Sequence, residues 1–339
     1  MALTSPPASP EGEVLDLRVV ALGGGHGLSA SLSALRRVVR DLTAVVTVAD
    51  NGGSSGRLRR EFGVLPPGDL RQALAALCGD DDWGRTWADV LQHRFASDGE
   101  MDNHAVGNLL IVTLWELLGD HVGGLDWVAR LLKAQGRVLP MAVTPLDILA
   151  SVRGLDPGDP EAATTVRGQV EVASTNGRVS AVRLEPEDPP ACREALAAIQ
   201  AADWVVLGPG SWFTSVIPHL LVPQLRECLV QSSACRALVL NLAPQSGETD
   251  GFSPERHLEV LAEHAPELRL DVVLADPVTV LDHAGLVEGA ERLGARLVVA
   301  ELAVGDGTPR HDPAKLARAY AGFMVPGLPA PEPLGPPSG

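Results

Sequence analysis

Short apolar runs without alternating polar residues recur along the 339-residue chain, and they restrict its fold more than any other feature. The runs occupy residues 19–22, 45–49, 204–207, 237–240, 271–274 and 296–299. A strand with one face in water alternates apolar and polar residues, whereas continuous apolar strands are typical of parallel sheets covered by helices on both faces. The sequence therefore predicts a three-layer, Rossmann-like α/β sandwich with a mainly parallel sheet.

The first run ends in a glycine-rich segment, Gly23-Gly24-Gly25-His26-Gly27. Glycines let the backbone turn sharply and present its N–H groups to an anion. The segment also fits a dinucleotide-type pattern, Gly25-x-Gly27-x-x-Ala30, which predicts a helix over residues 29–39. Asp50 follows about 20 residues later, where such folds hold a ribose hydroxyl. A nucleotide is therefore the expected ligand.

The second run leads into Asp50-Asn51-Gly52-Gly53-Ser54-Ser55-Gly56-Arg57, which gathers glycines, hydroxyls and a guanidinium. Backbone amides, O–H donors and a fixed positive charge together suit a phosphate group. Asp69 follows the rigid turn Leu65-Pro66-Pro67-Gly68, and we expect Asp69 to cap a helix that runs through residue 77.

Two later strand ends carry similar chemistry. The segment Gly208-Pro209-Gly210-Ser211 repeats the pattern of the first loop, and Ser211 is expected to open a helix whose positive end faces an anion. Asn241 follows the next apolar run. Ligands of open α/β sheets bind outside the carboxyl ends of the strands, so these loops should converge on one crevice.

Isolated residues give weaker indications. Asn108 either reaches a base or ribose, or serves capping and helix packing; His26 either donates to a phosphate or fills a gap beside glycines. Arg310 is either a clamp for phosphate or an ordinary surface arginine, and Asp312 is expected to cap a helix ahead of Pro313. The predicted ligand-binding residues are Gly24, Gly25, His26, Gly27, Asp50, Asn51, Gly53, Ser54, Ser55, Asp69, Asn108, Gly208, Gly210, Ser211, Asn241 and Arg310.

Composition changes along the chain predict one folded domain between two tails. Residues 1–14 and 325–339 are rich in proline, glycine, alanine and serine and are typical of disordered tails. Between them, residues 15–324 form the expected α/β domain. Residues 138–185 predict an antiparallel β excursion, with β-type segments at 148–153, 165–173 and 179–184 and Asn176-Gly177 as a hairpin turn between the last two.

The net charge of −16 argues against a nucleic-acid surface, which needs an excess of Lys and Arg on one face. The spacing of Cys78, Cys192, Cys228 and Cys235 is not typical of a metal site or a disulfide framework, and no metal ligands are predicted. No apolar run resembles a membrane span, and residues 1–13 lack a signal-peptide pattern. We expect a cytoplasmic protein, with a homodimer as the default assembly.

The motifs, taken in order, resemble the YvcK-like family of gluconeogenesis factors, which is related to the 2-phospho-L-lactate transferases (CofD). The resemblance rests on the glycine-containing segments at residues 23–29, 47–59, 65–71 and 208–211, on Thr214-Ser215-Val216-Ile217-Pro218 and on Gln245-Ser246-Gly247-Glu248-Thr249-Asp250-Gly251. His26 stands where many members have Thr, and Asn51 where many have a second Asp. The resemblance covers residues 18 to about 321.

The resemblance implies a CofD-like fold in a cytoplasmic bacterial protein required for normal cell shape and for growth on gluconeogenic carbon sources. It also implies binding of UDP-sugars, UDP-N-acetylglucosamine in particular, and possible contacts with envelope-synthesis or regulatory proteins. Our leading hypothesis is thus a nucleotide-sugar-binding regulatory protein.

Two enzymatic alternatives stay open. One is a phosphotransferase of the 2-phospho-L-lactate transferase type, in which Asp50 and Asp69 orient an acceptor hydroxyl or Mg²⁺ beside a diphosphate. Asn51 counts against catalysis because an amide carries no negative charge and cannot act as a general base. The other is an NAD-dependent oxidoreductase, which rests on the dinucleotide-type pattern and Asp50 alone.

Overall fold

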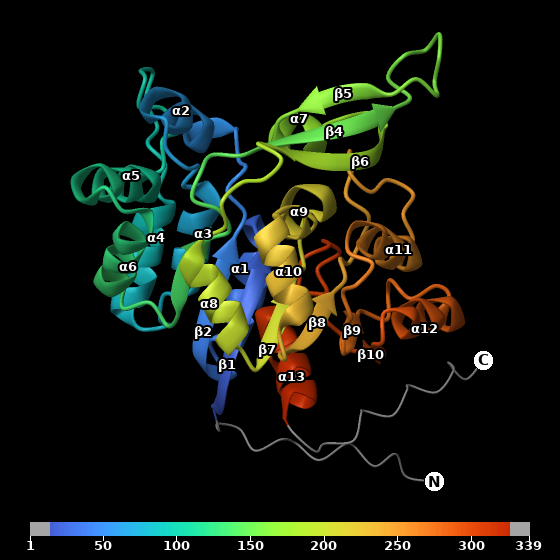
Figure 1. The fold of residues 1–339 in the computed structure, drawn as a ribbon. Helices are drawn as coiled ribbons and strands as arrows, with labels where there is room; N and C mark the ends of the chain where they lie inside the picture. The colour runs from blue at the N-terminus through green and yellow to red at the C-terminus, as the bar shows by residue number, and fades with distance from the viewer. Residues whose placement is uncertain (1–13, 326–339) are drawn as a thin grey trace.

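A seven-stranded parallel sheet forms the centre of the computed structural model, which describes residues 14–325 (Figure 1). Its strand order is β10-β9-β8-β7-β1-β2-β3, and each neighbouring pair is parallel. The strands are β1 (Leu15–Gly23), β2 (Val39–Val46), β3 (Arg137–Pro140), β7 (Trp204–Leu207), β8 (Cys235–Val239), β9 (Val272–Ala275) and β10 (Arg296–Val299). The predicted α/β class is confirmed.

Helices cover both faces of this sheet. Figure 1 shows α8 (Arg193–Ala201) and α10 (Pro223–Gln231) in front of the sheet, with α1 (Gly25–Leu35) and α13 (Pro313–Met324) behind it. The strands between them are buried on both faces, and β7 is buried at every residue. The remaining helices of the large layers are α2 (Gly53–Phe62), α3 (Gly68–Ala76), α4 (Asp82–Gln92), α5 (Val106–Leu118), α6 (His121–Leu132), α9 (Pro218–Leu221), α11 (Pro254–His264) and α12 (His283–Arg292).

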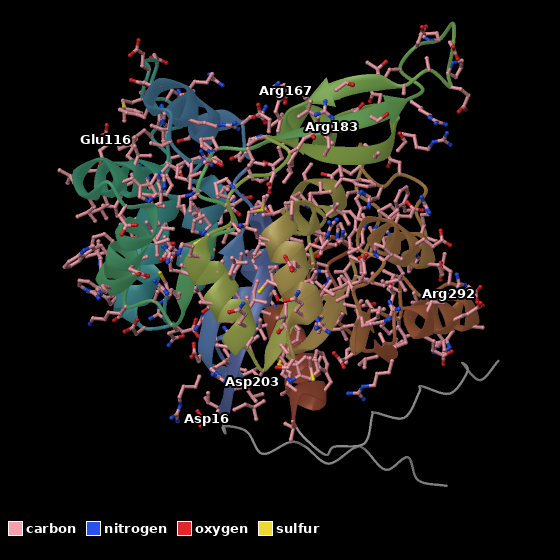
Figure 2. The ribbon with its side chains drawn as sticks, viewed as in Figure 1. Asp16, Glu116, Arg167, Arg183, Asp203 and Arg292 are labelled. Carbon is pink, nitrogen blue, oxygen red and sulfur yellow. The ribbon has the colours of Figure 1, made fainter. Side chains whose placement is uncertain are left out.

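The predicted β excursion is a small antiparallel sheet that projects beyond the carboxyl ends of the large one (Figure 1). Its strand order is β5 (Thr164–Arg167), β4 (Asp147–Arg153), β6 (Arg178–Glu185). Arg167, labelled in Figure 2, joins the three strands because its guanidinium contacts Asp147 on β4 and Glu185 on β6.

Three local predictions for this region were wrong. The excursion does not begin at residue 138, because β3 is an edge strand of the large sheet. The β segment expected up to residue 173 stops at Arg167, since Gly168 takes a φ of +108° and leads into the short helix α7 (Gln169–Ala173). Asn176-Gly177 is not a hairpin turn between paired strands, because β4 lies between β5 and β6.

One helix boundary also differs from the prediction, and one helix cap agrees with it. Helix α1 begins at Gly25, earlier than residue 29, because Gly24 already serves as its N-cap. Asp312 caps α13 by accepting hydrogen bonds from the N–H groups of Ala314 and Lys315, as predicted. Residues 1–13 and 326–339, which make up nearly all of the two predicted tails, lie outside the described residues. Among residues 14–325, no helix is long and apolar enough to cross a membrane.

Helix α13 is fixed to α1 by one buried polar contact. The hydroxyl of Tyr320, fully buried, lies 2.6 Å from the hydroxyl of Ser31. We expect Tyr320→Phe to lower the free energy of unfolding by about 1–2 kcal/mol, because it leaves the Ser31 hydroxyl buried without its partner. Urea denaturation measures this. Ser29→Ala is the control: it removes only a local bond to the Gly25 carbonyl and should change the free energy of unfolding by less than about 0.5 kcal/mol. Equal effects of the two variants would contradict a stabilising role of the Tyr320–Ser31 contact.

Candidate functional site

The chain reverses its direction of travel across the sheet between β1 and β7. From β1 it proceeds to β2 and β3 on one side, whereas β7 leads to β8, β9 and β10 on the other. Open α/β sheets bind their ligands at this kind of switch point, outside the carboxyl ends of the strands. The glycine segments that follow β1 and β7 therefore meet where a ligand is expected.

The two glycine segments are in direct backbone contact. A Cβ added at Gly27 would lie 2.3 Å from the carbonyl oxygen of Pro209, and one at Gly210 would lie 3.5 Å from the carbonyl of Gly24. Only glycine fits at residue 27 without moving one segment. Gly25, by contrast, has a φ of +57° and open space around its Cβ position. The predicted convergence of these segments is thus present.

Asp50 and Asp69 form an acidic pair beside Gly24. The Oδ2 atom of Asp69 lies 2.7 Å from the Cβ position of Gly24, and that of Asp50 lies 2.9 Å from the Cβ position of Gly68. Burial, and then the charge of Asp50, raise the pKa of Asp69 to about 7, although the Gly25 N–H and Arg71 oppose the shift. Near neutral pH the pair therefore holds a titratable proton.

The prediction that Asp69 caps α3 was wrong. Helix α3 begins at Gly68, its N-cap is Pro67, and no side chain accepts a hydrogen bond at that cap. Asp69 lies in the first turn, and its carboxylate is turned toward Gly24 and the Gly25 N–H group. The sequence indicated an acidic residue at a helix start correctly but assigned it the wrong partner.

Three helix N-termini open toward this acidic pair. The N-caps of α1, α2 and α3 are Gly24, Gly52 and Pro67, and none of them makes a side-chain capping bond. Asp50 accepts a hydrogen bond from the N–H of Gly52 (2.8 Å). Asp69 likewise accepts from the Gly25 N–H at the start of α1. Helix N-termini carry partial positive charge, so this arrangement suits a phosphate group whose ligand also satisfies the two carboxylates.

Ser54 and Asn108 lie behind the crevice in a buried network. The amide of Asn108 donates to Ser54 Oγ (3.0 Å), which also lies 3.1 Å from His104 Nδ1. Both residues are almost fully buried. They position the start of α2 against α5 and do not line the open space. Ser55 is buried against Gly68, next to Asp50.

Asn51 contacts the small sheet. Its amide donates to Glu171 Oε2 (2.6 Å) and its carbonyl oxygen accepts from the N–H of Val170 (3.0 Å), so both ends of the side chain are used by α7. Gln169 of the same helix donates to the carbonyl of Thr214 (3.3 Å). Helix α7 therefore spans from the β2–α2 loop to the segment after β7.

The loop after β7 is held by polar side chains from the loop after β8. Asn241 accepts from the Gly210 N–H (2.9 Å) and donates to the Gly210 carbonyl (2.8 Å), and Gln245 donates to Ser211 Oγ (3.2 Å). The helix expected after Ser211 is a five-residue π-helical turn, η1 (Trp212–Val216). Asn241 therefore acts on the loop rather than facing an open site.

The positive end of η1 is already occupied by a carboxylate of this chain. Glu248 accepts from the N–H of Phe213 (2.9 Å) and from Thr214 Oγ1 (2.6 Å). Burial raises the pKa of Glu248, while these hydrogen bonds oppose the rise. The expectation that this turn presents its positive end to a ligand was therefore wrong.

His26 and Arg310 are solvent-exposed. His26 lies in the first turn of α1. Arg310 pairs with Asp306 (2.5 Å) and Thr308 Oγ1 (2.9 Å) within its own loop. The neighbouring His311 contacts the backbone of Leu240 at the end of β8, so Arg310 stands at the same edge of the sheet as the glycine segments.

Comparison with known proteins identifies the family. A model of the CofD family, described as "2-phospho-L-lactate transferase CofD", matches residues 19–293. The chain belongs to the CofD family. A "Putative gluconeogenesis factor" of Mycobacterium tuberculosis is 54% identical over 318 residues, which span 93% of this chain and 92% of that protein. A "Gluconeogenesis factor" of Listeria monocytogenes is 35% identical over 320 residues, 91% of this chain and 95% of that protein.

A solved structure supports the same assignment. The crystal structure of a UPF0052 family protein from Bacillus halodurans has a TM-score of 0.81 and 32% identity, and the match covers 90% of this chain and 98% of that one. The family resemblance and the fold class drawn from the sequence are therefore confirmed.

Three further residues of this CofD-family chain belong to the site and were not singled out from the sequence. Ser215 Oγ lies 3.2 Å from the Cβ position of Gly24, opposite Asp69. Glu248 fixes η1, as described above. Arg71 is 2% exposed, and its Nε and Nη1 atoms have no hydrogen-bond partner among residues 14–325. Ser215 and Glu248 lie within the family motifs, but nothing in their local pattern indicates which element they contact.

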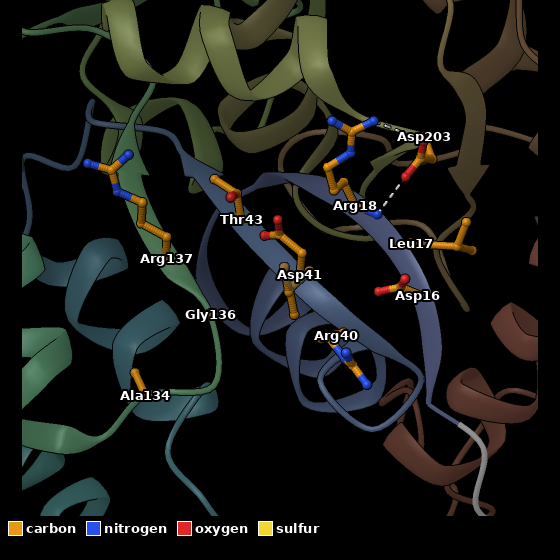
Figure 3. Close-up of a pocket in the computed structure, with 11 residues that line it drawn as sticks. Asp16, Leu17, Arg18, Arg40, Asp41, Thr43, Ala134, Gly136, Arg137 and Asp203 are labelled. Atoms are coloured by element: carbon orange, nitrogen blue, oxygen red, sulfur yellow. Dashed lines mark hydrogen bonds and ion pairs between the residues drawn. The ribbon is translucent and has the colours of Figure 1, made fainter.

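A broad hollow of about 1050 Å³ lies at the opposite end of the sheet (Figure 3). It is lined by the amino-terminal parts of β1 and β2, with charged side chains that include the Arg18–Asp203 ion pair. No glycine segment or helix N-terminus of the predicted site lines it. Its size alone does not make it the functional site, because the convergent chemistry lies at the carboxyl ends of the strands.

The acidic pair predicts an unusual dependence of stability on pH. The folded chain holds a proton on Asp69 up to about pH 7, whereas the unfolded chain releases it near pH 4, so the contribution of Asp69 to stability should fall as pH rises across this window. Asp69→Asn should remove that loss and, relative to wild type, stabilise the protein by roughly 1–3 kcal/mol more at about pH 8 than at about pH 4. Urea titrations at several pH values measure this. The exposed Asp41→Asn control should show no such trend; parallel curves for Asp69→Asn and wild type would contradict the assignment.

Proposed function

We propose that this CofD-family protein binds a nucleotide sugar of the UDP-N-acetylglucosamine type and acts as a regulator that links precursor supply to cell shape during gluconeogenic growth. The observation that carries the proposal is the convergence of three helix N-termini on Asp50 and Asp69 at the switch point of the sheet. The names of the relatives support the metabolic context.

A nucleotide sugar matches the two kinds of groups in the crevice. The N–H groups at the starts of α1 and α2, including the open positions Gly25 and Gly53, suit the diphosphate. Asp50 and Asp69 suit ribose or sugar hydroxyls, which donate to carboxylates. Arg310 would exchange its exposed partner Asp306 for a phosphate, and exposed ion pairs are weak enough to exchange readily.

Isothermal titration with UDP-N-acetylglucosamine tests this proposal. We expect saturable binding that Arg310→Ala weakens at least about tenfold, or about 1.4 kcal/mol. Arg292→Ala is the matched control, because Arg292 is an exposed arginine on α12 paired with Glu288 (Figure 2). Absence of heat up to about 1 mM ligand would contradict the proposal.

A second candidate is phospho-group transfer, favoured by the acidic pair itself and by the family description. Mg²⁺ is commonly held by one or two carboxylates together with substrate phosphates, and Asp50 and Asp69 fit that donor set. When bound, Mg²⁺ would neutralise charge on the transferred group. Asp50 and Asp69 would hold the ion, and the helix N-termini would orient the diphosphate.

An assay for transfer from labelled nucleotide-diphospho substrates distinguishes the two functions. As a binding regulator the protein should yield no labelled phosphoryl or phospholactyl product with Mg²⁺ and hydroxyl acceptors, while still binding the nucleotide sugar. Product that depends on Mg²⁺ and disappears in both Asp50→Asn and Asp69→Asn would instead establish the transferase.

A further inference from the structure

A second, smaller cavity of about 340 Å³ lies between the small sheet and α11. Its walls come from the end of β4, the start of β6, η1 and α11. Figure 1 shows the small sheet standing over α11 across this gap. The volume is at the lower end of the range for small-molecule sites, about 300–1,000 Å³.

The floor of the cavity is apolar and aromatic. Phe213, Val179 and Val260 are buried, and Phe252 is partly buried. The rings of Phe213 and Phe252 are 6.0 Å apart and meet edge to face at 81°. Phe252, packed on the buried Phe213, is the lining aromatic side chain with exposed surface, and a flat or aliphatic body would gain from leaving water against it.

The rim of the cavity is cationic. Arg153, Arg178 and Arg256 line it together with a single acidic residue, Glu263. In a chain with 43 acidic residues and 27 Lys and Arg residues, an ordinary patch of surface is acidic, so three arginines around one small cavity stand out. The Arg256 guanidinium also lies 5.9 Å from the centre of the Phe252 ring.

Each of the three arginines is paired with at least one glutamate, but these ion pairs are exposed and can be exchanged. Glu161 lies 3.1 Å from Arg153 and 3.8 Å from Arg178, while Glu259 and Glu263 contact Arg256. All six of these side chains are at least 40% exposed. Exposed pairs of this kind contribute little free energy, so an incoming carboxylate, sulfonate or phosphate can replace one of the glutamates.

We propose that this cavity is a second ligand site, separate from the nucleotide-sugar crevice, for a small anion that carries an aromatic or aliphatic body. The anionic group lies among the three arginines and the body lies on Phe213 and Phe252. Because Phe213 and Ser215 belong to the same π-helical turn, a ligand in this cavity contacts the element that also faces Gly24 in the crevice.

Binding of 8-anilinonaphthalene-1-sulfonate, an anionic aromatic dye, to the folded full-length chain tests the proposal by fluorescence. We expect one saturable site from which phenyl phosphate displaces the dye, whereas inorganic phosphate and benzyl alcohol, each with only half of the required chemistry, displace it at least fivefold less well. UDP-N-acetylglucosamine should not compete with the dye for the same site.

Variants locate the site. Arg178→Glu, at a side chain that is 66% exposed, and Phe252→Ala should each weaken dye binding at least fivefold. Arg183→Glu is the matched control, because Arg183 lies on the same strand β6 but outside the cavity (Figure 2). If Phe252→Ala does not fold, dye binding by Arg178→Glu alone tests the proposal. Unchanged binding in Arg178→Glu, an equal loss in Arg183→Glu, or competitive displacement by the nucleotide sugar would overturn the proposal.

Discussion

The backbone contact between the glycine segments after β1 and β7 is the constraint on which the site depends. These strands are neighbours at the centre of the sheet, yet the chain leaves them toward opposite halves. The Pro209 carbonyl occupies the space that a side chain at residue 27 would fill, and α1 can therefore start directly over the β7 loop. A larger residue at position 27 would push the start of α1 away from α2 and α3. The N–H groups of the three helix N-termini would then no longer point toward one place.

Two carboxylates beside three helix N-termini restrict the ligands that would suit the proposed site. The partial positive charge of the helix ends and the Gly25 N–H favour an ionised Asp69, but burial and the charge of Asp50 outweigh this help and raise the pKa of Asp69. Bare phosphate would be repelled by the pair. A suitable ligand therefore brings hydroxyl groups that donate to the carboxylates, or a cation that neutralises them, along with its phosphates.

The fold was predictable because continuous apolar strands and glycine stops are local signals; the apolar runs at residues 204–207 and 296–299 coincide with β7 and β10. The meeting of Gly24, Gly27 and Gly210 followed from a general rule of parallel sheets. The contact partners of individual side chains could not be predicted from such local signals. Asp69 has the residue type and place of a helix cap, yet its carboxylate faces Gly24, and only the packing of α3 against α1 decides between these partners.

Asn51 illustrates how the crevice and the small sheet depend on each other. An amide at this position satisfies both the Val170 N–H and the Glu171 carboxylate, whereas a second Asp would place two carboxylates side by side. The amide that weakens the case for catalysis thus has a use of its own, which is to fix α7 to the β2–α2 loop. Because Gln169 fixes the other side of α7 to Thr214, any ligand that shifts the loop at Asp50 relative to η1 must also strain or release α7, and with it the position of the small sheet.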